Sequence, residues 1–336
     1  MKENEIRPEA ILRRYLELSA QDAVNCFSDE PRVSIDCVAC GAAEAADYQF
    51  EKNRFAYSQC AVCGTLFQSP RPSIAAFEEF YRKSESSRYW AEVFFPAVAE
   101  VRREKIFRPR VERLSALCSE VGLDARSLID VGAGYGIFLD EWRRRFPDVN
   151  AVAVEPSASL ASECRAKGFK VVEDIAENVT GLDSSADLVT CFEVLEHIYD
   201  PLSFMRTLKN LARPGGYVFV STLGIEGFDL QLLWEKSGQI SPPHHINFLS
   251  IKGFEQLFQR AGLEDVRVST PGQLDVDIVR NAVRDQPGLL DEQRFLRTLL
   301  ADEGRAAAFQ QFLQEQRLSS HVWVIGRSPA RQEAVA

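Results

Sequence analysis

The stretch that decides the fold reads LIDVGAGYGIF, at residues 128–138. An apolar run leads into three alternating glycines, Gly132, Gly134 and Gly136, and a helix-forming run follows them. Glycine has no Cβ atom, so a loop of this kind can adopt positive φ and lets the backbone approach a ligand closely. A strand, a tight glycine loop and a helix in this order are typical of nucleotide-binding βαβ units. The stretch therefore predicts an α/β fold that binds a cofactor at this loop.

The spacing of the glycines separates two cofactor classes. A dinucleotide fingerprint, G-x-G-x-x-G, would need a third glycine where Ile137 stands, so an NAD-dependent oxidoreductase is disfavoured. Glu155 ends the next expected strand, where a carboxylate can accept hydrogen bonds from both hydroxyls of a ribose; the alternative is a solvated strand end. Asp130 precedes the loop and either meets an ammonium group or accepts from loop amides. These features favour a nucleoside cofactor without a pyrophosphate.

Strands alternate with helical segments from Ser127 onward, which is the pattern of a parallel sheet covered on both faces. The expected strands are residues 127–131, 151–154, 170–172, 188–192, 217–221, 263–268 and 322–326. A largely helical, charged insertion, 271–318, precedes the last strand. We expect four parts: an N-terminal helical segment (1–32), a cysteine module (33–72), a helical linker or lid (73–122) and the α/β domain (123–328).

Charge and hydropathy limit the class of partner. The 336 residues contain 39 Lys and Arg against 49 Asp and Glu, a formal charge of −10. Such an acidic chain has no general electrostatic attraction to nucleic acid or anionic lipid. No apolar run approaches the roughly 18 residues that a membrane span needs, and the first residues are charged. We expect a soluble, cytoplasmic protein that acts on a small molecule, not on nucleic acid or at a membrane; the oligomeric state is left open.

Four of the eight cysteines form the pattern C-x2-C-x19-C-x2-C, made of Cys37, Cys40, Cys60 and Cys63. A glycine follows each pair, and this spacing is typical of zinc held by four thiolates. A closed four-thiolate sphere leaves no open position for catalysis, so the expected Zn²⁺ is structural. The alternatives are a fortuitous grouping and a nucleic-acid-reading ribbon. The module's acidic balance disfavours the ribbon.

The ordered set of motifs resembles the class I S-adenosylmethionine-dependent methyltransferases over about residues 123–270. The motifs are DVGAGYG at 130–136, Glu155, FEVLEH at 192–197 and RPGG at 213–216. The resemblance implies a Rossmann-like sheet of seven strands, the last antiparallel, with S-adenosyl-L-methionine lying across the glycine loop. It assigns cofactor contacts to Asp130, Gly132, Gly134, Gly136, Glu155, Asp174 (near the adenine) and Glu193 (near the methyl end).

The cysteine module indicates which group of these methyltransferases the chain resembles. Together with the α/β domain, it is similar to bacterial sugar C-methyltransferases and related enzymes of polysaccharide and secondary metabolism. Those enzymes act on nucleotide-linked keto-sugars, and PPHHINFLS at 242–250 falls where they place a catalytic histidine segment. The resemblance implies C- or O-methylation of a nucleotide-linked sugar. The alternatives are methylation of another small metabolite and a non-catalytic zinc-containing binding module on a methyltransferase fold.

Methylation of a hydroxyl, or of a carbon beside a ketone, requires a base, and histidine suits neutral pH. The chain has four histidines, of which His321 opens the last expected strand and is interpreted as structural. In an extended segment the rings of His244 and His245 would point to opposite faces, so only one would face the site. We choose His245 as the base; His197 and Glu196 come next.

Overall fold

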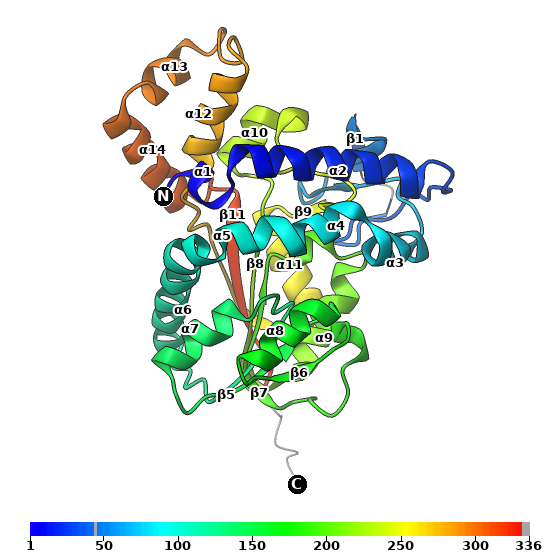
Figure 1. The fold of residues 1–336 in the computed structure, drawn as a ribbon, viewed down its shortest axis with the longest axis vertical. Helices are drawn as coiled ribbons and strands as arrows, with labels where there is room; N and C mark the ends of the chain where they lie inside the picture. The colour runs from blue at the N-terminus through cyan, green and yellow to red at the C-terminus, as the bar shows by residue number, and fades with distance from the viewer. Residues whose placement is uncertain (44–45, 331–336) are drawn as a thin grey trace. The chain divides into compact units, whose positions relative to one another are not determined.

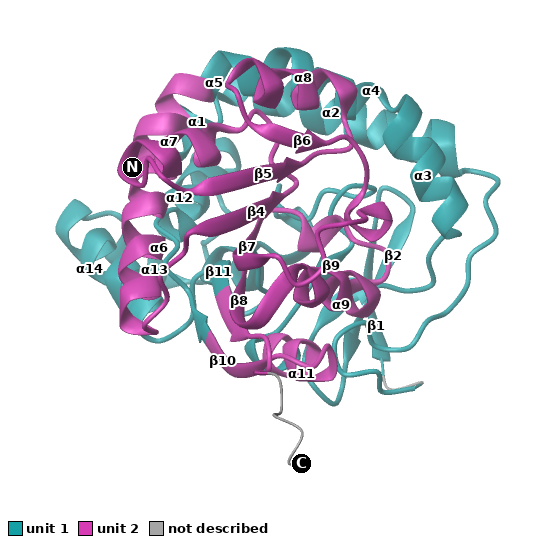
Figure 2. Cartoon of the chain, turned by 90° about the horizontal axis from the view of Figure 1, so that it is seen from below, with its two compact units in different colours: residues 1–98, 222–253, 268–323 teal, residues 99–221, 254–267, 324–336 magenta. Residues whose placement is uncertain are grey.

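The computed structural model describes residues 1–43 and 46–330. The chain divides into two compact units, drawn in two colours in Figure 2. Among the described residues, unit 1 comprises those within 1–98, 222–253 and 268–323, and unit 2 comprises 99–221, 254–267 and 324–330. Each unit is therefore built from segments that are distant in the sequence.

The α/β part is a seven-stranded sheet of strand order β10-β11-β8-β7-β4-β5-β6. Its strands are β4 (Ser127–Val131), β5 (Asn150–Val154), β6 (Lys170–Val172), β7 (Ala186–Phe192), β8 (Ala212–Leu223), β10 (Glu264–Ser269) and β11 (His321–Arg327). The pairs β4–β5, β4–β7, β5–β6 and β7–β8 are parallel. All seven expected strands are present, and the predicted Rossmann-like α/β fold is confirmed.

Strand β7 shows why this part of the sequence reads as a continuous apolar run. All seven of its residues are buried, as expected for a parallel strand with helices on both faces. Figure 2 shows α6 (Arg108–Glu120) and α7 (Ile137–Arg145) on one side of the strands of unit 2, and α9 (Pro201–Leu211) on the other. The remaining regular elements here are α8 (Ala158–Ala166) and the 3₁₀ turns η3 (Ala176–Asn178) and η4 (Leu195–His197). Asp200 starts α9 by accepting hydrogen bonds from the N–H groups of Leu202 and Ser203.

Unit 1 contains a second, four-stranded sheet of order β1-β2-β3-β9. Its strands are β1 (Ala46–Lys52), β2 (Phe55–Cys60), β3 (Leu66–Gln68) and β9 (Asn247–Phe248), and all three pairings are antiparallel. β9 lies far along the chain from the other three strands, and its pairing with β3 is not apparent from the sequence. Part of the expected catalytic segment, 242–250, is thereby attached to the cysteine module.

Helices make up the rest of unit 1 and the segment that leads into unit 2 (Figure 1). N-terminal to the α/β sheet these are α1 (Glu3–Ile6), α2 (Glu9–Phe27), α3 (Ile74–Lys83), α4 (Glu85–Tyr89), the π-helical η1 (Trp90–Phe94), α5 (Phe95–Arg102) and the π-helical η2 (Arg103–Phe107). The later ones in unit 1 are α10 (Phe228–Leu233), the 3₁₀ turn η5 (Trp234–Lys236), and α12 (Asp275–Asp285), α13 (Arg294–Leu300) and α14 (Glu303–Glu315) of the insertion. The helix α11 (Ile251–Arg260) belongs mostly to unit 2.

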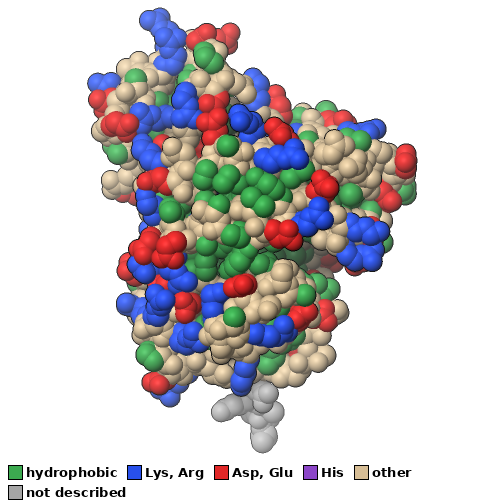
Figure 3. Space-filling model, in the orientation of Figure 1, with side chains coloured by type: hydrophobic (Ala, Val, Ile, Leu, Met, Phe, Trp, Pro, Cys, Tyr) green, Lys and Arg blue, Asp and Glu red, His purple; other side chains and the backbone are tan. Residues whose placement is uncertain are grey.

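Two surface features bear on the partner. None of the helices in the described residues has both the length and the apolar character needed to cross a bilayer. On the face drawn in Figure 3, basic and acidic side chains are interspersed around apolar areas. This face therefore offers no continuous basic surface.

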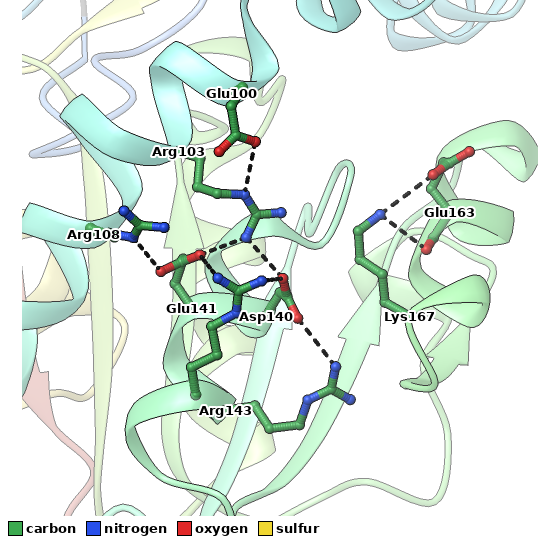
Figure 4. Close-up of polar contacts among 9 residues, drawn as sticks. Glu100, Arg103, Arg108, Asp140, Glu141, Arg143, Glu163 and Lys167 are labelled. Carbon is green, nitrogen blue, oxygen red and sulfur yellow. Dashed lines mark hydrogen bonds and ion pairs between the residues drawn. The ribbon is translucent and has the colours of Figure 1, made fainter.

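A buried ion network in unit 2 joins α7 to the first residue of η2 and the first residue of α6 (Figure 4). The Glu141 carboxylate is 6% exposed and accepts from Arg103 Nη1 at 2.6 Å and from Arg108 Nε at 3.0 Å. Arg103 also reaches Asp140 Oδ2 at 2.8 Å. Because α7 directly follows the glycine loop, these contacts anchor the helix that begins at the loop's C-terminal end.

We predict that Glu141→Gln destabilises the protein by about 2 kcal/mol, because a nearly buried carboxylate loses charge-assisted hydrogen bonds to two arginines. Glu163→Gln is the matched control: it removes an exposed ion pair with Lys167, worth roughly 0–0.5 kcal/mol. Urea unfolding followed by circular dichroism measures both free energies. Equal losses in the two variants would contradict the assigned role of the network.

Candidate active site

The glycine loop and Glu155 form one hydrogen-bonded unit at the carboxyl end of β4. Gly134 N donates to Glu155 Oε2 at 2.8 Å, and Ser157 N donates to Oε1 at 3.0 Å. Glu155 is 5% exposed, and burial raises its pKa. A carboxylate has about four acceptor sites, so two backbone donors leave capacity for further hydroxyl donors. Both sequence interpretations of Glu155, a backbone-satisfied strand end and a hydroxyl acceptor, are compatible with this geometry.

The three loop glycines are required for different reasons, although all three have positive φ. A Cβ on Gly132 would lie 2.6 Å from Val194 Cγ2, and one on Gly136 would lie 3.0 Å from Cys164 Sγ. A Cβ on Gly134 would meet no atom within 4 Å. Packing within the protein therefore accounts for Gly132 and Gly136, whereas Gly134 faces open space that a ligand could use.

Asp130 and Glu193 lie at the ends of the adjacent strands β4 and β7. Asp130, 2% exposed, accepts from Thr190 Oγ1 at 2.7 Å, and burial raises its pKa to about 7. Glu193 has φ of 56°, a backbone conformation that costs a non-glycine residue about 1–3 kcal/mol and that clusters at functional sites. Its Oε1 accepts from Ser221 Oγ at 2.5 Å.

Arg110, on α6, is a residue of this region that the sequence did not single out. Its Nη2 lies 3.3 Å from Glu193 Oε1, its guanidinium stacks 4.4 Å from the centroid of Phe192, and it is 6% exposed. Burial lowers the pKa of Arg110, while Glu193 and Asp130 oppose that shift. Arg110 lies outside the strand-and-loop motifs, so no sequence pattern marks it.

Unit 2 also holds three further candidates. Asp174 follows β6 and accepts from its own turn, from Ile175 N at 2.8 Å and Asn178 Nδ2 at 2.9 Å. Glu196, buried, and His197, half-buried, lie in η4, two residues after the end of β7. Unit 2 therefore contains every expected cofactor residue, together with the two second-choice bases.

His244, in unit 1, lies in a turn at residues 242–244 rather than in the extended segment expected from the sequence. The side chain is 4% exposed, and its Nε2 lies 2.7 Å from Ser86 Oγ. The ring packs 4.9 Å from the Phe80 centroid and 5.4 Å from the Tyr15 centroid. Burial lowers its pKa to about 3, so His244 is neutral at physiological pH.

His245 is held differently and is half-buried. Its Nδ1 lies 2.6 Å from the backbone carbonyl oxygen of Gln239. A carbonyl oxygen only accepts, so Nδ1 carries the proton and Nε2 is the basic nitrogen of the neutral ring. The two neighbouring histidines therefore differ in burial and in the atom that each engages.

The four cysteines come together in unit 1. Their sulfur atoms all lie within 4.8 Å of one another, with Cys37 and Cys63 3.6 Å apart and Cys40 and Cys60 3.7 Å apart. A tetrahedral ion with Zn–S bonds of about 2.3 Å would place the sulfurs roughly 3.8 Å apart. The donor set and its spacing fit Zn²⁺.

Both cysteine turns have the same backbone form. Gly41 N donates to Cys37 O at 2.8 Å, and Gly64 N donates to Cys60 O, also at 2.8 Å. The two glycines have φ of 75° and 83°, a region that favours glycine. The glycines after the cysteine pairs therefore close two equivalent turns around the cluster.

Comparison with known proteins identifies the class. A family model described as a methyltransferase domain matches residues 99–268, half of the chain. The chain belongs to this family of methyltransferase domains, and the expected S-adenosylmethionine-dependent methyltransferase fold is confirmed.

Individual relatives match parts of the chain. The ubiquinone biosynthesis O-methyltransferase of Xanthomonas campestris pv. campestris is 36% identical over 120 residues, 33% of this chain and 48% of that protein. The protein of the same name from Acinetobacter baylyi is 32% identical over 111 residues, 30% of this chain and 45% of that protein. The chain thus spans about half the length of these curated relatives.

One solved structure shows the fold over a larger share of the chain. The plantazolicin methyltransferase BamL, in complex with a triazolic desmethylPZN analog and SAH, aligns with a TM-score of 0.50 and 15% identity. The alignment covers 75% of this chain and 94% of that one. At this identity the likeness supports the fold alone. The narrower resemblance to sugar C-methyltransferases stays a prediction.

We predict that Gly134→Val abolishes binding of S-adenosylmethionine in isothermal titration calorimetry and leaves the protein folded, because the branched side chain would fill the open space at the loop. Gly122→Val is the matched control, since Gly122 also has positive φ and also meets nothing within 4 Å. Normal affinity in Gly134→Val, or equal loss in both variants, would contradict the assignment of the loop.

We predict about one zinc per chain, as a closed four-thiolate site requires, measured by plasma mass spectrometry on purified protein. Cys37→Ser should lose the metal and lower the midpoint of thermal unfolding, because formation of such a site contributes to folding free energy. Cys26→Ser, outside the cluster, should keep both. The zinc site would be refuted if the wild-type protein contained no metal and Cys37→Ser were as stable as the wild type.

Proposed function

We propose that this protein transfers a methyl group from S-adenosylmethionine to a small-molecule acceptor. The observation that carries the proposal is the open face of Gly134, beside carboxylates that follow adjacent parallel strands. Membership of the methyltransferase-domain family gives the reaction class.

The residues of unit 2 suit the chemical groups of this cofactor. The spare acceptor capacity of Glu155 suits two ribose hydroxyls, and Asp130 and Glu193 suit an ammonium group. Arg110 adds a buried cation beside Glu193. Such a cation suits the carboxylate of the cofactor's methionine part. When bound, S-adenosylmethionine supplies a methyl group on a sulfonium centre for in-line transfer. Asp174 is proposed to lie near the adenine.

The chain's own contribution to the chemistry is alignment of the acceptor and removal of its proton. We assign the role of base, which takes the proton from the acceptor, to His245 Nε2. The hydrogen bond from Nδ1 to Gln239 O leaves Nε2 as the basic atom of the ring. His244 is a poorer base, because its Nε2 lies against Ser86 Oγ and burial lowers its pKa to about 3. His197 and Glu196 remain the next choices.

For the acceptor we propose a nucleotide-linked sugar that is methylated at carbon or oxygen. The support is the combination of the four-cysteine module with the PPHHINFLS segment, and β3 of the module pairs directly with β9 of that segment. The relatives named for O-methylation in ubiquinone biosynthesis match at most 120 residues, a third of this chain, so we do not take the acceptor from them. A panel that includes ubiquinone precursors and nucleotide sugars separates the two acceptor classes.

We predict that His245→Gln lowers kcat by roughly 10²–10⁴, the usual contribution of a general base, and leaves S-adenosylmethionine affinity unchanged. His244→Gln should lower kcat much less. The assay is mass spectrometry of the methylated acceptor, with calorimetry for the cofactor. If His245→Gln turns over normally, the base lies elsewhere. If the wild-type protein binds the cofactor but methylates no acceptor, the non-catalytic alternative is favoured.

A further inference from the structure

A buried polar cluster in unit 1 lies outside every motif that the sequence singled out. It consists of Asp229 on α10, Gln239, Asp275 at the start of α12, and Ser320, which are 0%, 8%, 1% and 4% exposed. Polar groups buried to this degree are costly unless they are hydrogen-bonded to one another. Their hydrogen bonds lead from the helical insertion to His245.

Gln239 is the link between the cluster and the histidine. Its backbone carbonyl accepts from His245 Nδ1 at 2.6 Å. Its side-chain Nε2 donates to Asp229 Oδ2 and lies 3.4 Å from Ser320 Oγ. Residue 239 is therefore anchored through its side chain while its backbone holds the imidazole.

Asp275 lies near Asp229 and has hydrogen-bond donors of its own. The Asp275 carboxylate accepts from Ser319 Oγ at 2.5 Å, Ser320 N at 2.6 Å and Gln310 Nε2 at 2.7 Å. Burial and the nearby Asp275 carboxylate hold the pKa of Asp229 well above its ordinary value. Three donors therefore satisfy the buried Asp275 side chain, and a neutral Asp229 can remain buried as the acceptor for Gln239.

We propose that Asp229 and Gln239 are positioning residues for His245: Asp229 fixes the Gln239 side chain, and the Gln239 carbonyl fixes the Nδ1–H tautomer and the orientation of the imidazole. This inference rests on the proposed function, because it takes His245 as the base. It gives the insertion 271–318 a role, since Asp275 at the start of α12 accepts from the N–H of Ser320, whose Oγ lies 3.4 Å from Gln239 Nε2. The tautomer sets which nitrogen can accept a proton, and the orientation sets where that nitrogen lies.

The test uses the full chain and two readouts. Long-range ¹H–¹⁵N NMR reports the tautomer of each imidazole, and four histidines are few enough to assign with single His→Gln variants. This readout needs no acceptor and no turnover. Steady-state methyl transfer then gives kcat and KM separately.

In the wild-type protein we expect His245 in the Nδ1–H tautomer. Gln239→Ala and Asp229→Leu should give a mixture of tautomers and lower kcat by roughly 10- to 100-fold, as small misplacement of a catalytic group does. KM for S-adenosylmethionine should not change. Asp229→Asn keeps an acceptor oxygen and should retain both the tautomer and kcat.

Gln231→Ala is the matched control, because the Gln231 side chain on α10 likewise donates a hydrogen bond in unit 1, to the backbone carbonyl of Ile225 at 2.7 Å. It should leave the His245 signals unchanged. An unchanged His245 tautomer in Gln239→Ala, or the same kcat loss in Gln231→Ala as in Gln239→Ala, would overturn the positioning role. A normal kcat in His245→Gln would instead overturn the base assignment, and the NMR result would still show whether Gln239 fixes the ring.

Discussion

Parallel pairing of β4 with β5 on one side and with β7 on the other is the constraint on which unit 2 depends. Asp130 is opposite Ala153 of β5 and Thr190 of β7, so the three strands end together. Glu155 and Glu193 each follow the last residue of their strand directly. The register therefore brings carboxylates from three segments of the chain to one edge of the sheet, beside the glycine loop.

Gathering acidic groups at one edge has an electrostatic cost, because like charges in a poorly solvated place disfavour ionisation. The raised pKa of Asp130, about 7, is mainly a consequence of burial, and Glu155 adds to it. Arg110 offsets part of this cost by its contact with Glu193. A ligand with an ammonium group and a sulfonium centre would offset more, so the electrostatics of this edge suit the proposed cofactor.

In unit 1 the histidine segment has little regular structure, so its backbone carbonyls need donors from elsewhere. The cysteine module supplies several: Lys52 Nζ donates to Ser237 O, Asn53 Nδ2 to Pro242 O and Tyr57 OH to His245 O. Ser250 Oγ donates to Cys63 O. The module that is expected to hold zinc therefore also fixes the backbone on both sides of the two histidines.

The sequence by itself determined the strands of the seven-stranded sheet, the glycine loop and the four-cysteine cluster, because each depends on local pattern. Apolar runs define buried strands, positive φ favours glycine, and paired thiols at short spacing meet in tight turns. The difference between His244 and His245, the contact of Arg110 with Glu193 and the link from Asp229 through Gln239 to His245 were decided only by the tertiary structure. These contacts join residues whose separation in the chain ranges from a few positions to more than eighty, and they depend on which side chain is buried against which donor. Two adjacent histidines look equivalent in a sequence; burial against Ser86 and Phe80 makes one of them a packed, neutral ring, and the Gln239 carbonyl gives the other a defined basic nitrogen.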